Sequence, residues 1–343
     1  MTARKGRITL RVLHVVESDA PEAGSATILV AGLVAALRRS GVESQMCAAE
    51  SPTFDGVDLV HLHGWETAAA YRAAVCCRRA AVPYVVSLLG SIQSRALARR
   101  GPWTRVRQWW VDRGGLAAAA AWVVSNSAER EPITRRGGAV EQLPYGIDFD
   151  GYAGEARQRS DGLNLLVLGP IHPREGLVPL LKALAENAAL AETDGQVALA
   201  GREEGPWRRM IEAAVRRRGF AERVTFVPAA TVAEQRRLLA EASLVVCPSL
   251  APRCPTSLLQ AIAAGVPLLA SREVLPDALS DLAAHCKPRR AEFARRLTEL
   301  LSEDQTKLRN RAAQLRDAAR ARLDWSKLAG RYIDLYERCA RLS

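Results

Sequence analysis

The stretch that decides the fold is residues 247–271, CPSLAPRCPTSLLQAIAAGVPLLAS. With the apolar residues before it, this stretch predicts a strand over 244–248, a helix over 256–264 and a second strand over 266–270. Gly265 ends the helix, and a turn-rich loop precedes it. This order predicts one strand–helix–strand unit of a parallel sheet, with the helix N-terminus facing the crevice where α/β folds bind anions.

The same stretch resembles the nucleotide-sugar signature of the family-4 glycosyltransferases. The chain keeps the family's Pro-Ser pair at Pro248 and Ser249, and its Ala-x-Ala-x-Gly-x-Pro run at residues 261–267. At the two positions where the family carries glutamate, this chain has Pro252 and Gln260. The resemblance implies an α/β protein of GT-B architecture: two Rossmann-like domains facing each other across an interdomain cleft, with a C-terminal helix crossing back to the first domain.

The resemblance also implies a function. Members of this family transfer a sugar from a nucleotide-sugar donor to an acceptor without a metal ion, and they retain the configuration at the sugar carbon. For this chain it implies a UDP-, GDP- or ADP-sugar as substrate, a glycan or lipid-linked acceptor as partner, and no cofactor. Polysaccharide biosynthesis in the cytoplasm, at the inner face of the membrane or away from it, is the expected setting.

Length and composition are those of a soluble protein with two domains of ordinary size. The chain has 343 residues, 48% of them hydrophobic and 25% charged. Its formal net charge of +11 and pI of about 9.7 raise the question of acidic partners. Much of the charge lies in helical stretches at 216–218 and 289–322, where a solvated helix face explains it. Since no nucleic-acid motif accompanies the charge, we do not expect nucleic acid as a partner.

Neither the cysteines nor the N-terminus indicates an extracellular or membrane-spanning protein. Seven cysteines without a Cys-x-x-Cys spacing favour free thiols in a reducing compartment. The apolar run at 8–16 is short and is interrupted by Arg11 and His14, so it predicts a first strand instead of a signal peptide. Membrane contact would be peripheral, and residues 102–113, PWTRVRQWWVDR, are the candidate for it because they interleave basic and aromatic side chains. Packing of this segment against its own domain is the alternative.

The chain is expected to divide into three parts. An N-terminal Rossmann-like domain on the acceptor side covers 1–150, and a C-terminal Rossmann-like domain on the nucleotide-sugar side covers 151–322. The polar stretch 151–162 is expected to be the linker between them. A last helix over 323–343, led by Trp325 as in the resembling enzymes, is expected to return to the N-terminal domain.

Three positions of the N-terminal domain carry site expectations. Residues 57–63, VDLVHLH, match the family's Asp-hydrophobic-hydrophobic-His-x-His, which makes His63 the candidate catalytic residue. A histidine that merely packs at a strand end is the alternative. Gly24 is all that remains of the family's Gly-Gly loop near the donor phosphate. Leu89 stands where the family has a histidine or arginine facing the transferred sugar, and it can neither donate nor accept a hydrogen bond.

The segment between the two expected domains contains one more match to the family and one short acidic pattern. Residues 142–148, QLPYGID, resemble the family's Pro-Asn-Gly-Val-Asp, with Tyr145 in place of asparagine. Asp148 and Asp150 spell a DxD, which is the metal–diphosphate motif of a different glycosyltransferase fold. We interpret its position at the hinge as coincidence and expect no metal site.

The C-terminal domain opens with a second motif of the family. Residues 169–177, GPIHPREGL, resemble Gly-Arg-x-His-Pro-x-Lys-Gly-Leu, with Pro170 and Glu175 in place of the two cations. Charge-assisted hydrogen bonds are worth about 1.5–3 kcal/mol each, so losing both would weaken diphosphate binding strongly. Arg174 and Arg253 lie next to substituted positions and are the candidates for compensation.

Two hypotheses follow. The first is an active transferase whose donor or diphosphate site uses Gly24, Gly169, Arg174, Arg202, Arg253, Thr256, Ser257 and Gln260. The second is a catalytically inactive homologue that acts as a scaffold or regulatory partner in glycan or cell-envelope assembly. The family positions that favour the second are Leu89, Pro170, Glu175 and Pro252.

Overall fold

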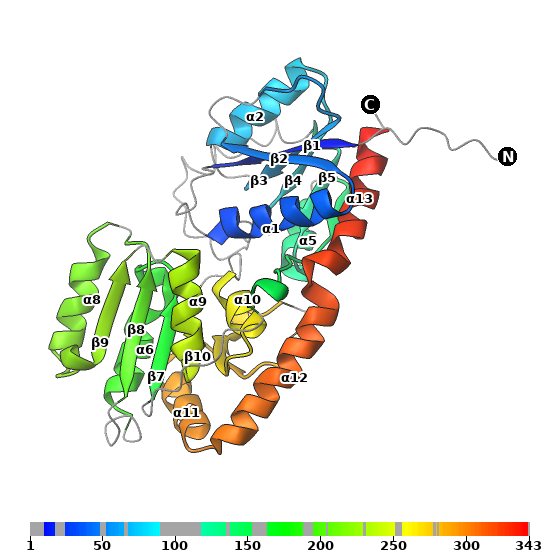
Figure 1. Ribbon diagram of the computed structural model, residues 1–343. Helices are drawn as coiled ribbons and strands as arrows, with labels where there is room; N and C mark the ends of the chain where they lie inside the picture. The colour runs from blue at the N-terminus through cyan, green and yellow to red at the C-terminus, as the bar shows by residue number, and fades with distance from the viewer. Residues whose placement is uncertain are drawn as a thin grey trace. The chain divides into compact units, whose positions relative to one another are not determined.

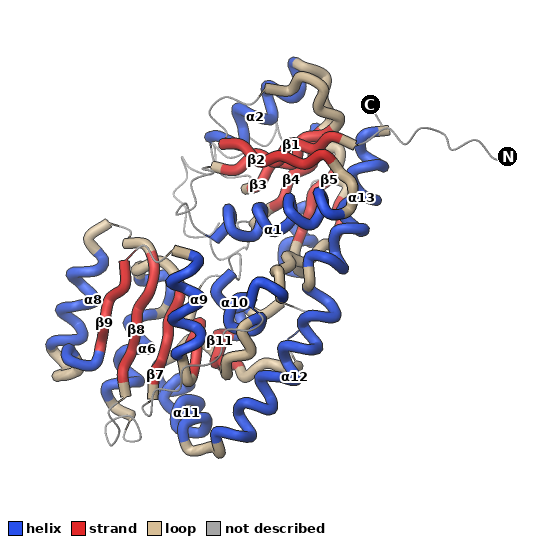
Figure 2. The backbone as a smooth tube through the Cα atoms, viewed as in Figure 1, coloured by secondary structure: helices blue, strands red, loops and turns tan. Residues whose placement is uncertain are grey.

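The computed structural model forms two compact units. The residues that it describes are 10–17, 25–48, 53–64, 68–89, 118–134, 138–152, 163–187, 195–203, 205–228, 231–250, 256–276, 279 and 281–341. The first unit comprises Met1–Gly146 together with Trp325–Ser343, and the second comprises Ile147–Asp324 (Figure 1). Each unit has its own parallel sheet, as the two sets of strands in Figure 2 show.

The first unit is a six-stranded parallel sheet with helices on both faces. Its strands are β1 (Arg11–Val16), β2 (Glu43–Ala48), β3 (Leu59–His63), β4 (Tyr84–Ser87), β5 (Ala121–Val124) and β6 (Val140–Gln142). The strand order β2-β1-β3-β4-β5-β6 reverses direction beside β1, which is where α/β sheets form ligand sites at the carboxyl ends of the strands. Helix α1 (Ser25–Arg39) packs against β2 and β1, helix α2 (Ala68–Arg79) packs against β3 and β1, and α5 (Ser127–Thr134) packs near β5 and β6 (Figure 1).

The C-terminal helix α13 (Trp325–Ala340) belongs to the first unit and packs against α1. Its buried face follows helical spacing: Trp325, Leu328, Ala329, Tyr332, Leu335, Tyr336 and Cys339. The indole of Trp325 occupies the space over Gly32 of α1, because a Cβ built on that glycine would lie 2.5 Å from Trp325 Nε1. The expected return of the last helix to the first domain is confirmed.

The second unit is also a six-stranded parallel sheet. Its strands are β7 (Asn164–Leu168), β8 (Gln196–Gly201), β9 (Val224–Pro228), β10 (Leu244–Cys247), β11 (Leu268–Ser271) and β12 (His285–Cys286). The order β12-β11-β10-β7-β8-β9 is that of a Rossmann sheet, with the direction reversing between β7 and β10. The helices are α6 (Leu177–Ala185), α8 (Trp207–Arg216), α9 (Val232–Glu241), α10 (Thr256–Ala263), α11 (Arg290–Leu301) and α12 (Gln305–Leu323).

The stretch that opened the sequence analysis forms the predicted strand–helix–strand unit. β10 and β11 pair in parallel, with Val245 opposite Leu268, and α10 connects them. Both strands and nearly all of α10 are buried, which explains their continuous apolar sequence. With the two parallel sheets, this confirms the predicted α/β architecture.

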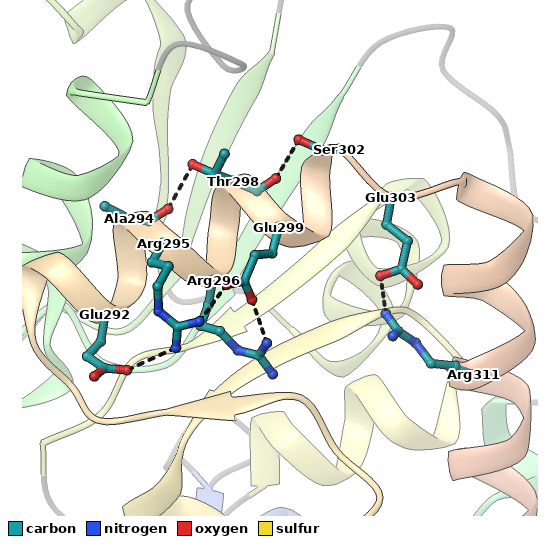
Figure 3. Close-up of polar contacts among 9 residues, drawn as sticks. All are labelled: Glu292, Ala294, Arg295, Arg296, Thr298, Glu299, Ser302, Glu303 and Arg311. Carbon is teal, nitrogen blue, oxygen red and sulfur yellow. Dashed lines mark hydrogen bonds and ion pairs between the residues drawn. The ribbon is translucent and has the colours of Figure 1, made fainter.

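The positive charge of the last helices is partly balanced within the protein. On α11, Arg295 pairs with Glu292 at 3.6 Å and with Glu299, and Arg296 pairs with Glu299 at 2.6 Å (Figure 3). Such exposed pairs add little to the stability of the helix, because water and salt screen them. Asp150 likewise pairs with Arg320 of α12.

No helix among the described residues is both long enough and apolar enough to cross a lipid bilayer. The basic and aromatic segment 102–113 lies outside the described residues.

Replacing Gly176 with alanine should destabilise the second unit. Gly176 has a φ of 69°, and a Cβ there would lie 2.0 Å from the Pro248 carbonyl oxygen. We expect Gly176→Ala to lower the free energy of unfolding by about 3 kcal/mol or more, measured by urea denaturation. Gly219 is the matched control, because its φ is 65° and no atom lies within 4 Å of the place that a Cβ would take. Gly219→Ala should therefore cost only about 1 kcal/mol; equal losses would contradict the steric argument.

Candidate functional site

Three histidines form a buried cluster in the sheet of the first unit. His14 lies on β1 and is paired in register with His61 on β3. His63 lies two residues beyond His61, so the two side chains leave the same face of the strand. His14 and His61 are 0% exposed and His63 is 6% exposed. One ring nitrogen of each histidine lies within 4.8 Å of the others, which among the described residues makes this cluster the one group of three with metal-site spacing.

Hydrogen bonds already engage all three rings. His61 Nδ1 lies 2.7 Å from the Tyr336 hydroxyl on α13, and His61 Nε2 lies 2.7 Å from the Ser87 hydroxyl at the end of β4. His14 Nδ1 lies 2.9 Å from His63 Nε2. His61 would have to give up one of its two hydrogen bonds to bind a metal ion, whereas His14 Nε2 and His63 Nδ1 have no hydrogen-bond partner among the described residues.

Burial keeps the cluster uncharged at neutral pH. Loss of solvation lowers the pKa of His14 to about 3. Burial also holds the pKa values of His61 and His63 well below 6.5, and the neighbouring histidines lower them further. Neutral imidazole has one N–H donor and one bare nitrogen acceptor, so each ring can both donate and accept a hydrogen bond.

The turn after β4 is held in an unusual conformation next to this cluster. Leu89 has a φ of 52°, a left-handed value that costs a leucine about 1–2 kcal/mol. Its backbone N–H donates to the buried hydroxyl of Tyr145 at 2.9 Å. Tyr145 thus fixes the turn that contains Leu89. His63 is paired in register with Ser87, so His63 and Leu89 belong to the same edge of the sheet.

In the second unit, glycines let the loop after β7 pass close to neighbouring strands. Gly169 has a φ of 143°, and a Cβ on Gly201 would lie 2.0 Å from the Gly169 carbonyl oxygen. Gly176 is the N-cap residue before α6 and lies close to the carbonyl of Pro248, directly after β10. The loop therefore crosses the switch point of this sheet, where a nucleotide site is expected. Arg202 follows β8 at the same edge, and its carbonyl accepts the N–H of Ile171 at 2.9 Å.

The charges of this loop partly cancel. Arg174 Nε lies 3.4 Å from Glu175 Oε1, and the two side chains are only 28% and 15% exposed. The Arg174 carbonyl accepts the N–H of Leu250 at 2.9 Å, so the backbone of the loop is tied to the segment after β10. Pro170 also lies in this loop, and it offers no side-chain donor. Arg174 and Glu175 therefore form an ion pair within this loop.

Helix α10 brings three further predicted residues to the same sheet edge. Thr256 and Gln260 are buried at 2% exposure, and Ser257 hydrogen-bonds the thiol of Cys247. Burial raises the pKa of that thiol to about 12, which makes it an inert packing group. Gln260 Nε2 donates to Gln235 Oε1 on α9 at 2.8 Å, so one face of the amide is already committed.

Four predicted positions lie outside the described residues: Gly24, Pro252, Arg253 and the segment 102–113. Their roles remain predictions.

Sequence reasoning misses the partners of the predicted residues. From the sequence, His14 is only a polar interruption of the first strand, and Ser87, Tyr336 and Gln235 have no role in the site. A signal exists for His14: a histidine inside a buried strand needs hydrogen-bond partners, and the nearest parallel strand ends in His61 and His63.

Comparisons with known proteins identify the family of the chain. Residues 53–146 match the family model described as a glycosyl transferase 4-like domain, and residues 162–303 match the model described as glycosyl transferases group 1. One model falls in each unit, and together they cover more than half of the chain. The chain belongs to the group 1 glycosyltransferases of GT-B fold, which transfer a sugar from a nucleotide-sugar donor to an acceptor.

Individual relatives are distant. The chain is 24% identical over 303 residues to the GDP-mannose:cellobiosyl-diphosphopolyprenol alpha-mannosyltransferase of Xanthomonas campestris, covering 81% of this chain and 73% of that protein. Sucrose-phosphate synthase from Thermosynechococcus elongatus has a TM-score of 0.77 at 17% identity, covering 97% of this chain and all of the other. HepE of Anabaena in complex with UDP has a TM-score of 0.72 at 16% identity, covering 96% and 100%. At these identities the two structures establish the fold.

Acidification should destabilise the first unit through the histidine cluster. The unfolded histidines take up protons near pH 6.5 and the folded ones only far below it, so stability is full above about pH 6.5 and falls as the pH drops toward 3. The expected slope is about 1.4 kcal/mol per pH unit for each histidine that stays neutral. Urea unfolding between pH 7.5 and 5 measures this slope. The His14→Leu variant lacks one of the three histidines, so its unfolding free energy should depend on pH less steeply, by the contribution of one histidine. A flat profile would contradict the assignment.

Proposed function

We propose that this protein is an active, retaining hexosyltransferase that moves a sugar from a nucleoside diphosphate donor to a lipid-linked acceptor. The observation that carries the proposal is the second unit's switch point, where the loop 169–176 and the start of α10 meet the carboxyl ends of β7 and β10. This is the position at which Rossmann sheets bind diphosphates. The fold shared with a UDP complex and the family membership support it.

The donor site we propose relies on backbone amides more than on cations. The N-terminus of α10 offers the backbone N–H groups of its first turn, beginning at Thr256 and Ser257, and the positive end of the helix dipole. Arg174 supplies the nearby positive charge once it turns from Glu175 to the diphosphate. In this proposal Gln260 accepts from the ribose hydroxyls through its amide oxygen, because its Nε2 donates to Gln235. The departing diphosphate would be stabilised as the bond from the anomeric carbon to its oxygen breaks.

The acceptor class follows from the curated relative. That mannosyltransferase acts, by its name, on a cellobiosyl-diphosphopolyprenol with GDP-mannose as donor. We extend the class to this chain as a diphosphopolyprenol-linked sugar, and we place the acceptor at the first unit, with His63 facing its hydroxyl group. GDP-mannose is the first donor to test.

The test is a transfer assay with purified protein, a polyprenyl diphosphate-linked disaccharide and GDP-, UDP- and ADP-sugars, with EDTA present throughout. We expect one donor to yield a trisaccharide product whose new linkage keeps the donor's anomeric configuration. Transfer that requires added Mg²⁺ or Mn²⁺ would contradict the metal-independent proposal, and an inverted linkage would contradict retention.

A second candidate function is that of an inactive homologue acting as a scaffold or regulatory partner. The specific observation in its favour is the Arg174–Glu175 ion pair, which leaves the loop without the net positive charge that a diphosphate needs.

Two substitutions in the loop separate the candidates. If Arg174 binds the diphosphate, Arg174→Ala should weaken nucleotide binding about 10- to 100-fold in calorimetric titration, the value of one charge-assisted hydrogen bond. Glu175→Gln should strengthen it, because the change removes the competing carboxylate and leaves the shape nearly unchanged. Arg209→Ala, on the exposed surface of α8, is the matched control for loss of an arginine. If the wild type binds no nucleotide and Glu175→Gln does not restore binding, the inactive homologue is the better description.

A further inference from the structure

The loops that follow β7 and β8 lie side by side at the carboxyl-end edge of the second sheet. The N–H of Ile171 donates to the Arg202 carbonyl at 2.9 Å. Ile171 also forms a parallel bridge with Glu203, so the pairing of the two strands continues into their loops. The loop that leads into α8 is therefore held against the loop 169–176, which belongs to the proposed donor site.

This arrangement brings two aromatic rings together at the same edge. Trp207 is the first residue of α8, and its ring meets that of His172 in an edge-to-face contact, with centroids 5.3 Å apart and planes inclined by 67°. His172 is itself fixed, because its Nδ1 accepts the N–H of Arg174 at 3.0 Å. Trp207 is only partly buried, so some of its indole surface is open to solvent. An aromatic surface that is fixed on one side and open on another is able to stack on a ligand.

Two carboxylates of this region are balanced by an arginine. Arg208, which follows Trp207, donates to Glu203 and also to Glu212 at 2.8 Å. Their pairing lowers the repulsion that these carboxylates would exert on an anionic ligand beside Trp207.

The distance between Trp207 and the proposed diphosphate site fits a nucleoside. The start of α10 follows β10 and Trp207 follows β8, with β7 between these two strands. The two places are thus separated by two strand spacings, about 10 Å, a span that a ribose and a base can cover. Gln260 bonds Gln235 of α9, and α9 packs against β7, so the proposed ribose contact lies on the β7 side of α10. Diphosphate, ribose and base would then follow one another in the direction of Trp207.

We propose that Trp207 is the stacking platform for the nucleobase of the donor. Its ligand class is a nucleoside diphosphate whose base lies against the indole. Every base has a π-face, so stacking adds affinity without selecting one base through hydrogen bonds, and purines gain more contact than pyrimidines because they are larger. The inference rests on the proposed function for the place of the diphosphate, and it adds a neutral source of donor affinity.

Calorimetric titration of the full-length protein with GDP, ADP, UDP and inorganic pyrophosphate tests the platform. We expect Trp207→Leu to weaken binding of GDP and ADP about 10-fold and binding of UDP less, since a stacking contact is lost. Pyrophosphate has no base, so the variant should bind it as the wild type does. Trp207→Phe should keep most of the affinity for GDP. Unchanged GDP binding in Trp207→Leu, or equal weakening for GDP and pyrophosphate, would overturn the proposal.

A control on the same helix and the transfer assay complete the test. Met210 is exposed on α8, so Met210→Ala removes a large apolar side chain from this helix and should leave the affinity for GDP unchanged. GDP binding that depends on Trp207 without any sugar transfer would contradict the proposed activity and leave the platform intact. A wild-type protein that binds none of the nucleoside diphosphates would overturn both.

Discussion

The hydrogen bond between His61 and Tyr336 joins residues 275 positions apart, and the first unit depends on it and on the packing around it. Trp325, Tyr332 and Tyr336 bury one face of α13 against the sheet and α1. A buried histidine and a buried tyrosine hydroxyl would each be costly without a partner, so their mutual bond makes the attachment specific as well as apolar. The same contact fixes His61, and this leaves His63 as the histidine of the pair on β3 with an uncommitted nitrogen.

The carboxyl-end edges of the two sheets carry different kinds of polar groups. In the second unit, close backbone approaches at glycine shape the loop, and in the donor site that we propose the N-terminus of α10 supplies amide donors. In the first unit, neutral polar side chains share hydrogen bonds in a dry environment. Within the described residues, neither edge displays a dense field of charge, although the chain as a whole carries +11. A donor held by amides is recognised by shape and hydrogen-bond direction more than by attraction over distance.

Much of the fold could be predicted from the sequence. Continuous apolar runs predict β10 and β11, because parallel strands that are buried on both faces have apolar residues at nearly every position. Helical spacing and a terminal glycine predict α10 between them. β2 escapes prediction because its sequence ESQMCA mixes polar and apolar residues, as befits the edge of the sheet. α2 escapes it because alanine-rich helices give a weak periodic signal. The site is harder: the spacing of residues places Arg174 and Glu175 in the right loop, but only side-chain directions reveal that they pair with each other.

The first unit is built from both ends of the chain, with Ile147–Asp324 inserted between its two segments. During synthesis, the sheet of the first unit emerges long before α13, while the second unit has its whole sequence available before the last helix leaves the ribosome. The second unit can thus reach its final fold first, although it comes later in the sequence. Until Trp325–Ala340 is synthesised, the surface around Gly32 and the histidines of the first unit stays uncovered, so the first unit cannot complete its fold before the last helix is made.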